Sequence, residues 1–366
     1  MSVNARTQSA GEALRTLRAG WQAQVEGGLT TSWMLHGRPG VGKTEIVRTL
    51  ADEIGADLFD IRLTTIEPQD LRGLPYYDHD AQKTVWYRPE DLPDDPARPA
   101  ILFLDELTAA SPYLQPTVYG LLQERRVGRH VLPSNVFIVA AGNTVDDGAV
   151  AYEMGTALSD RLIHLQVTAN SKDWLEHYAV DRGIHPMVTA FLRARPELLD
   201  TTEDSLRRGD MIACTPRSWE RVSDIVTAVN DTDLRDVMIA GTIGATPGAE
   251  FARLASELQA QVTVEELMAL PRRDRVAQYP DTMNGLVALI YGLVARADGD
   301  TMPTVIDMMA DIAAIRSTKG LPLSELTSFG FELLIRKALN DGLHEAFRGS
   351  EAYAAYVAAR EADGVR

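Results

Sequence analysis

The sequence predicts an α/β sandwich built on a parallel sheet, followed by an all-helical region. Five short apolar runs, at residues 32–37, 58–63, 100–106, 136–143 and 162–167, are nearly continuous in hydrophobic character. Such runs are typical of strands that are buried on both faces, as in a parallel sheet. Helical patterns such as "TEIVRTLADEI" and "YLQPTVYGLLQERR" lie between most of them. Alternating strands and helices favour the α/β class, and the strand signal fades after residue 170.

The pattern divides the chain into three parts. Residues 1–168 form the α/β domain, 169–258 a small helical domain, and 259–366 a helical C-terminal extension. In the second part, "TPRSWERVSDIVTAV" predicts a helix with Thr215 as its N-cap and Pro216 in its first turn. In the third part, Met and Leu residues recur every three or four positions, which predicts a helical core.

Composition limits the classes of function. The chain has 36 basic and 52 acidic residues, a net charge of −16, which opposes a large phosphate-backbone footprint and favours a protein partner over nucleic acid. No window is apolar for the ~20 residues that a membrane span needs. The first 28 residues predict a polar amphipathic helix and lack the apolar core of a secretion signal, so we expect a cytoplasmic protein. The single cysteine, Cys214, excludes an internal disulfide and is expected to be a packed core residue.

The segment "GRPGVGKT" has the spacing of a phosphate-binding P-loop, between a predicted strand and a predicted helix. Backbone N–H groups must wrap around triphosphate oxygens there, and side chains at the glycines would obstruct that approach. Lys43 is expected to reach the β- and γ-phosphates, and the Thr44 hydroxyl to bind Mg²⁺. The residues expected to bind the nucleotide are Gly37, Pro39, Gly40, Val41, Gly42, Lys43 and Thr44. The predicted cofactors are ATP and Mg²⁺.

Two carboxylates end the third predicted strand, in "ILFLDEL". Parallel sheets place their ligand sites at the carboxyl ends of strands. Asp105 is therefore expected to hold Mg²⁺, and Glu106 to orient and polarise the attacking water. Asn143 ends the next strand and could help to place that water, although asparagine is also a common turn residue. Arg161 and Arg217 are lone arginines, which are usually solvated.

The order of these motifs resembles that of an AAA+ ATPase, and the closest fit is the MoxR-like branch. The resemblance covers residues ~30–225 and rests on the P-loop, the Asp-Glu strand, "DLRGLP", "LTAASPYLQPTVYGLLQERRV" and "TPRSWE". It implies a P-loop NTPase sandwich followed by an all-α lid. It also implies that Asn143 is sensor 1, Arg161 an arginine finger for a neighbouring subunit, Arg217 sensor 2, and the assembly a hexameric ring. "ALSDR" stands where a "QLDR"-type sequence is usual.

We therefore expect an ATP-driven remodelling machine in which nucleotide binds between the α/β domain and the lid. The resemblance suggests a protein partner with a von Willebrand factor type A domain. A nucleic-acid motor or loader of the AAA+ type is the main alternative, which the acidic charge disfavours. A small-molecule kinase is a second alternative. The long helical region and the absence of an acceptor signature disfavour it.

Two segments are predicted to be hairpins. Residues 71–93 carry Tyr76, Tyr77, Trp86 and Tyr87 around a turn-like "DHDAQK". These aromatics either grip a partner or pack against their own domain. The second segment, "ERRVGRHVLP", could contact a partner or a neighbour's nucleotide, or carry solvated charge.

Overall fold

The protein is described by a computed structural model that covers residues 4–143, 156–259, 264–315 and 320–362. The chain forms two compact units, Met1–Asn170 and Ser171–Arg366, which are described separately. The first is an α/β unit, and the described residues of the second contain only helices and their connections. The α/β class followed by a helical region is thus confirmed. The finer division of the helical region at residue 258 stays a prediction.

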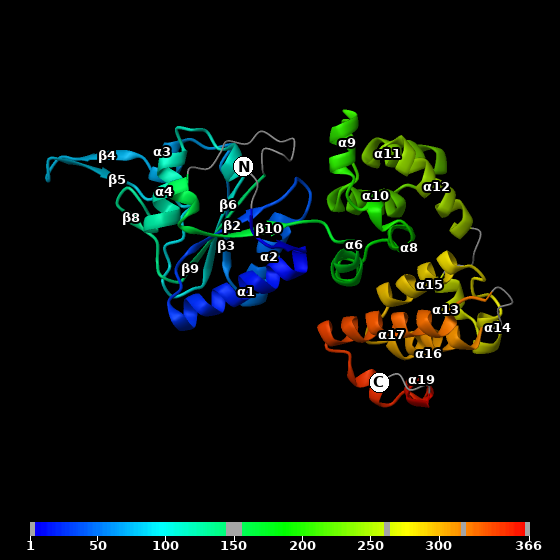
Figure 1. Ribbon diagram of the computed structural model, residues 1–366. Helices are drawn as coiled ribbons and strands as arrows, with labels where there is room; N and C mark the ends of the chain where they lie inside the picture. The colour runs from blue at the N-terminus through cyan, green and yellow to red at the C-terminus, as the bar shows by residue number, and fades with distance from the viewer. Residues whose placement is uncertain (1–3, 144–155, 260–263, 316–319, 363–366) are drawn as a thin grey trace. The chain divides into compact units, whose positions relative to one another are not determined.

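The first unit contains a six-stranded parallel sheet in the order β1-β10-β2-β9-β6-β3 (Figure 1). Its strands are β1 (Thr7–Gln8), β2 (Ser32–His36), β3 (Asp57–Arg62), β6 (Ala100–Asp105), β9 (Val136–Gly142) and β10 (Leu162–Val167). All five expected strands are present. The edge strand β1 was missed, because two residues are too few to show a hydrophobic period.

Helices cover both faces of this sheet, which explains the continuous apolar runs. The helices of the first unit are α1 (Ala10–Gly27), α2 (Lys43–Ile54), α3 (Pro68–Arg72), the 3₁₀ turn η1 (Leu107–Ala109), α4 (Gln115–Glu124) and α5 (Thr156–Ser159). Phe103 of β6 packs with residues of α1 and α2, whereas its neighbour Leu102 packs with residues of α4 on the opposite face. Alternate side chains of a strand point to opposite faces, so a strand covered on both sides must be apolar throughout.

Both expected hairpins are present. They are β4 (Pro75–Asp78) with β5 (Lys83–Trp86), and β7 (Arg126–Val127) with β8 (His130–Val131). The β4–β5 hairpin extends away from the sheet as an arm (Figure 1). Trp86 is half-buried beneath the Arg72 guanidinium, 4.8 Å from the ring centroid. Tyr77 and Tyr87 are 50% and 63% exposed, so these two rings do not pack fully against their own domain.

The second unit packs its helices around two apolar centres. Its helices are α6 (Ser171–Asp173), the π-helical turn η3 (Trp174–Tyr178), α7 (Ala179–Asp181), α8 (Pro186–Ala194), η4 (Pro196–Leu198), α9 (Thr202–Arg208), α10 (Pro216–Ala228), α11 (Thr232–Ile243), α12 (Ala245–Gln259), α13 (Val264–Ala269), α14 (Arg272–Val276), α15 (Met283–Ala295), α16 (Met302–Asp311), η5 (Ile312–Ala314), α17 (Leu323–Asn340), α18 (Glu345–Arg348) and α19 (Glu351–Ala362). Phe191, Trp219 and Phe251 form the first centre, with ring centroids 5.3–6.0 Å apart. Met308 and Met309 are buried in the second, as the Met and Leu spacing predicts.

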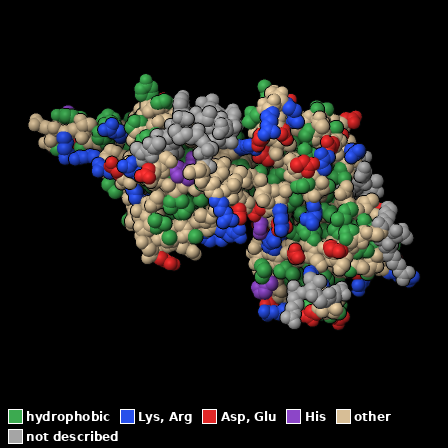
Figure 2. All heavy atoms as spheres, in the orientation of Figure 1, with side chains coloured by type: hydrophobic (Ala, Val, Ile, Leu, Met, Phe, Trp, Pro, Cys, Tyr) green, Lys and Arg blue, Asp and Glu red, His purple; other side chains and the backbone are tan. Residues whose placement is uncertain are grey.

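The local signals read from the helical region are also confirmed. The Thr215 side chain caps α10 by accepting a hydrogen bond from the Ser218 amide, and Pro216 is the first residue of that helix. Cys214 is fully buried, and burial raises the pKa of its thiol to about 11, so it behaves as a packed residue. None of the described helices is long and apolar enough to cross a membrane. Acidic and basic side chains are interspersed on the visible face of this unit (Figure 2).

Candidate functional site

The P-loop is the turn between β2 and α2, and its glycines are needed for different reasons. Gly40 and Gly42 have φ angles of 81° and 103°, in the region that favours glycine. A Cβ on Gly37 would lie 2.5 Å from the carbonyl oxygen of Val167, so this glycine is required where the loop leaves the sheet beside β10. A Cβ on Gly42 would meet no described atom within 4 Å. Val41 is buried in the core beside α2 and anchors the loop.

The α2 helix begins at Lys43, directly after the loop, and spans 12 residues. Its N-cap residue, Gly42, has no side chain that could cap its first amide groups. The first amide groups of a helix have no partner within the helix, and the helix dipole is positive at that end. The loop and the helix together therefore form a site that favours a phosphate group.

The Lys43 ammonium group lies across this loop. It donates hydrogen bonds to the carbonyl oxygens of Gly37 and Arg38, the latter at 3.1 Å, and to Oδ1 of Asn143 at 2.9 Å. All three acceptors are neutral. A phosphate oxygen is charged, and charged acceptors form stronger hydrogen bonds with an ammonium group. The lysine is thus held at the loop by contacts that a nucleotide phosphate can replace.

Thr44 and Asp105 form a second contact at the same end of the sheet. The Thr44 hydroxyl lies 3.4 Å from Oδ2 of Asp105, while Oδ1 of Asp105 accepts a hydrogen bond from the Glu106 amide at 2.8 Å. Asp105 is only 8% exposed, and this burial raises the pKa of its carboxyl group. Mg²⁺ is usually held by one or two protein oxygens together with nucleotide phosphates and water. This pair fits that donor set.

Glu106 follows β6 with a left-handed backbone, φ 60°, and its side chain is 38% exposed. Its carboxylate accepts a hydrogen bond from the Thr64 hydroxyl and lies 3.7 Å from Nε of Arg62. Sequence analysis missed both partners. Arg62 ends β3 and pairs in register with Asp105 of β6. Their position at the end of the neighbouring strand is a signal that could have found them.

Asn143 connects the two halves of the site. It follows β9, which lies between β2 and β6, so the parallel sheet brings it between the P-loop and the Asp-Glu pair as expected. Its side chain accepts the hydrogen bond from Lys43, and its amide donates to Oγ1 of Thr108 at 3.0 Å. Thr108 lies in the turn after Glu106 and was not singled out from the sequence.

Arg161 lies at the other end of the sheet. It precedes β10, whose first residue, Leu162, pairs with Ser32 at the start of β2. The P-loop follows the far end of β2, five residues later, and at about 3.3 Å per residue the two ends are separated by roughly 16 Å. The exposed Arg161 is therefore not part of the cluster formed by Lys43, Thr44 and Asp105.

Two arginines of the second hairpin segment bind nearby carbonyl oxygens. Arg125 donates hydrogen bonds to the carbonyl oxygens of Pro133 and Val136, and burial lowers its pKa, so it supports the loop before β9 and is not a solvated charge. Arg126 binds the Gly128 carbonyl oxygen within its own hairpin. Arg217 is the second residue of α10 in the helical unit, and its side chain is exposed. Its sensor role stays a prediction.

Comparison with known proteins identifies the domain that carries this cluster. Residues 32–162 match the family model of the AAA domain, dynein-related subfamily. These residues form an AAA ATPase domain. The match begins at β2 and ends at the first residue of β10, so this AAA domain contains the P-loop, the Asp-Glu pair, Asn143 and Arg161.

Two curated proteins are similar to part of this chain. The chain is 31% identical over 134 residues to the uncharacterized protein YeaC of Bacillus subtilis, covering 36% of this chain and 40% of YeaC. It is 32% identical over 115 residues to the ATPase family gene 2 protein homolog B of Bos taurus, covering 31% of this chain and 12% of that protein. The chain thus spans less than half of the length of either relative.

Solved structures were compared as well. The P216G mutant of RuvB from Thermotoga maritima is 16% identical, with a TM-score of 0.39 over 81% of this chain and 88% of that one. A second Thermotoga maritima RuvB structure, described as a Holliday junction branch migration motor, has a TM-score of 0.36.

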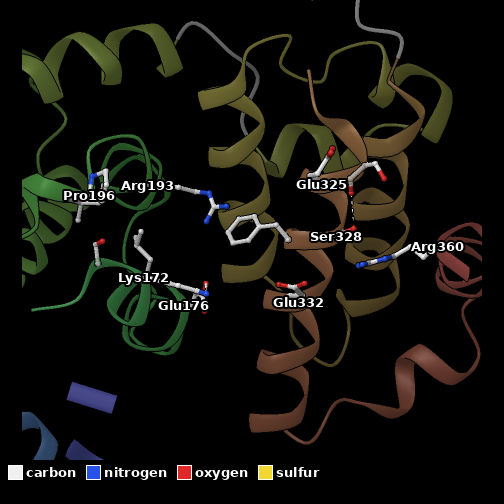
Figure 3. A pocket seen from close by; sticks show the side chains of 13 residues that line it. Lys172, Glu176, Arg193, Pro196, Glu325, Ser328, Glu332 and Arg360 are labelled. Atoms are coloured by element: carbon white, nitrogen blue, oxygen red, sulfur yellow. Dashed lines mark hydrogen bonds and ion pairs between the residues drawn. The ribbon is translucent and has the colours of Figure 1, made fainter. Parts of the chain in front are cut away.

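The helical unit contains a cavity of about 740 Å³ (Figure 3). Figure 3 shows side chains from α6, α8, α17 and α19 around it, with both acidic and basic groups. The Arg193 guanidinium lies 3.6 Å from the centroid of the Phe329 ring, and Lys172 lies 4.0 Å from Glu176. Since the charges that line it are of both signs, this cavity has no clear preference for an anionic ligand.

Proposed function

We propose that this protein is an ATP-dependent remodelling ATPase of the AAA+ class that acts on a protein partner and hydrolyses ATP at the subunit interfaces of a ring. The single observation that carries the proposal is that Arg161 and the nucleotide-binding residues lie at opposite ends of the sheet of the AAA domain. Lys43, Thr44, Asp105 and Glu106 converge at the carboxyl end of the sheet, whereas Arg161 lies at the opposite end. A guanidinium so placed can serve the site of a second copy and not its own.

The roles in that site follow from its chemistry. The loop amides and Lys43 would hold the ATP phosphates, and Thr44 with Asp105 would hold Mg²⁺. The metal ion, when bound, neutralises charge that develops on the phosphate oxygens. Glu106 would orient the attacking water, since its carboxylate leaves the core beside Asp105, and Asn143 would act as sensor 1 from its place next to Lys43.

The choice of a protein partner rests on charge and on exposed surface. A chain of net charge −16 is poorly suited to a large phosphate-backbone footprint. The β4–β5 arm instead presents Tyr77 and Tyr87 to solvent, and tyrosine is enriched at protein interfaces. We further propose the MoxR-like branch, a hexameric ring, and a partner with a von Willebrand factor type A domain, on the sequence segments that carry that resemblance. Stimulation of ATP hydrolysis by DNA, without stimulation by protein, would favour the nucleic-acid motor instead.

Subunit mixing tests the proposal directly. Arg161→Ala should bind ATP and be nearly inactive alone, because arginine fingers contribute about 10³–10⁵-fold in enzymes that use them. Lys43→Ala should be inactive because its own site is empty. Mixed rings should recover part of the phosphate release, since some interfaces join an intact site from the first variant to an intact Arg161 from the second.

Mixed rings must be confirmed independently, for example by co-purification of differently tagged subunits. No recovery in confirmed mixed rings would contradict a finger supplied by a second copy. Full activity of Arg161→Ala alone would remove this residue from the mechanism.

A further inference from the structure

Two histidines bridge the P-loop strand and the strand that follows Arg161. His36 is the last residue of β2, directly before Gly37, and His164 is the third residue of β10. Nε2 of His36 lies 2.8 Å from Nδ1 of His164, and the two rings are stacked with centroids 5.1 Å apart. His36 is only 7% exposed. This bond joins the base of the nucleotide site to β10.

The second nitrogen of His164 contacts the turn that carries Arg161. Nε2 of His164 lies 2.9 Å from the carbonyl oxygen of Ser159 and 3.1 Å from its hydroxyl. Ser159 is the last residue of α5, two residues before Arg161. His164 therefore binds the end of α5, two residues before Arg161, the expected arginine finger.

The hydrogen-bond pattern assigns the tautomers. A carbonyl oxygen can only accept, so Nε2 of His164 carries a proton and donates to Ser159. In the neutral ring, Nδ1 of His164 is then an acceptor, and it accepts a hydrogen bond from Nε2–H of His36. His36 thereby selects the tautomer in which His164 can bind the Ser159 carbonyl.

We propose that His164, oriented by His36, is a positioning residue that fixes the turn at residues 159–161 so that Arg161 reaches the nucleotide of a neighbouring subunit. The inference rests on the proposed function. It goes beyond the role of Arg161 itself because it assigns the placement of that arginine to an imidazole pair connected to the subunit's own P-loop. A catalytic group displaced by ~1 Å can lose about 10²-fold in rate, so one lost anchor is enough to impair it.

Two isosteric substitutions separate the contacts of His164. The amide of glutamine can replace Nε2, so His164→Gln keeps the donor to Ser159 and loses the bond to His36. The amide of asparagine lies near the position of Nδ1, so His164→Asn keeps an acceptor for His36 and loses the bond to Ser159. If the hydrogen bond from His164 to Ser159 is what positions Arg161, His164→Asn should lower the rate more than His164→Gln.

The test places each substitution in one member of the mixed ring. The reference is the mixture of Lys43→Ala, which donates Arg161, with Arg161→Ala, which provides the intact site. His164→Asn added to the Lys43→Ala subunit should lower the recovered phosphate release at least about tenfold. The same substitution added to the Arg161→Ala subunit should leave the recovered rate within about twofold, because that subunit donates no finger. His164→Gln in the Lys43→Ala subunit should retain most of the recovery.

The two mixtures also control for misfolding, because the same His164→Asn substitution is present in both. Equal loss in both arms would show a general structural role and overturn the proposal. An unchanged rate with His164→Asn in the donor, or equal loss with asparagine and glutamine there, would overturn it as well. No recovery in the reference mixture, with mixed rings confirmed, would instead reject the trans finger, and this inference with it.

Discussion

Replacing Glu106 by glutamine should slow ATP hydrolysis strongly and change the free energy of unfolding only slightly. The substitution keeps the shape of the side chain and removes its charge. The left-handed backbone at residue 106 is retained, so any strain there is common to both side chains. The Thr64 hydroxyl can donate to the amide oxygen of glutamine as it does to the carboxylate.

Apart from its effect on catalysis, the substitution removes only a weak ion pair between Glu106 and Arg62. Arg62 lies 3.7 Å from Glu106, and its side chain is 60% exposed. Exposed ion pairs contribute about 0–1 kcal/mol, so the free energy of unfolding should change by no more than about 1 kcal/mol. A positioned base contributes about 10²–10⁴-fold, so turnover should fall at least ~100-fold, which corresponds to about 2.7 kcal/mol in the activation free energy.

The assay measures phosphate release, ATP affinity and thermal unfolding on the same preparations. Glu106→Gln should bind ATP with Mg²⁺ and accumulate in the ATP-bound state, which makes it the variant of choice for capturing a protein partner. Glu53→Gln is a matched control, because Glu53 pairs with Arg18 on the surface of the same domain and should leave turnover near normal. Near-normal turnover of Glu106→Gln would show that another residue positions the water.

Two further predictions concern binding and pH. Lys43→Ala should abolish ATP binding in a calorimetric titration while the circular dichroism spectrum is unchanged, and unaltered affinity would remove Lys43 from the site. Burial lowers the pKa of His185 from 6.5 to about 4. The unfolded chain therefore takes up this proton at a higher pH than the folded one, and about 2 kcal/mol of stability should be lost between pH 7 and pH 5. His185→Asn keeps an acceptor for the Met187 amide and should reduce that loss in urea unfolding, whereas an unchanged loss would assign it to other groups.

Much of the fold was predictable because its signals are local. A buried parallel strand is apolar throughout, and the P-loop has a fixed spacing, so both can be recognised within a short window. The strand β1 has only two residues and is defined by its pairing with β10, which no local pattern records.

The parts of the candidate site that sequence analysis missed are those that depend on register. Thr64, Thr108 and His164 are ordinary residues in sequence, and each becomes relevant through one hydrogen bond to a residue that matters: Glu106, Asn143 and the Ser159 turn respectively. The bonds of Thr64 and Thr108 form because distant strands end at the same edge of the sheet, whereas His164 binds Ser159, five residues earlier in the chain. The roles assigned to Asn143, Arg161 and Arg217 came from family resemblance and stay predictions.

The contacts of Asn143 suggest why binding and hydrolysis belong to one cluster. Its side-chain oxygen accepts from Lys43, and its backbone amide donates to Thr108, in the turn that follows Glu106. A phosphate that takes the Lys43 ammonium as its partner would release the Asn143 side chain, while the bond to Thr108 keeps its backbone in place. The freed amide would then remain next to Lys43, on the side of the loop that faces Thr108. Phosphate binding would in this way complete the arrangement that orients water, without movement of the sheet.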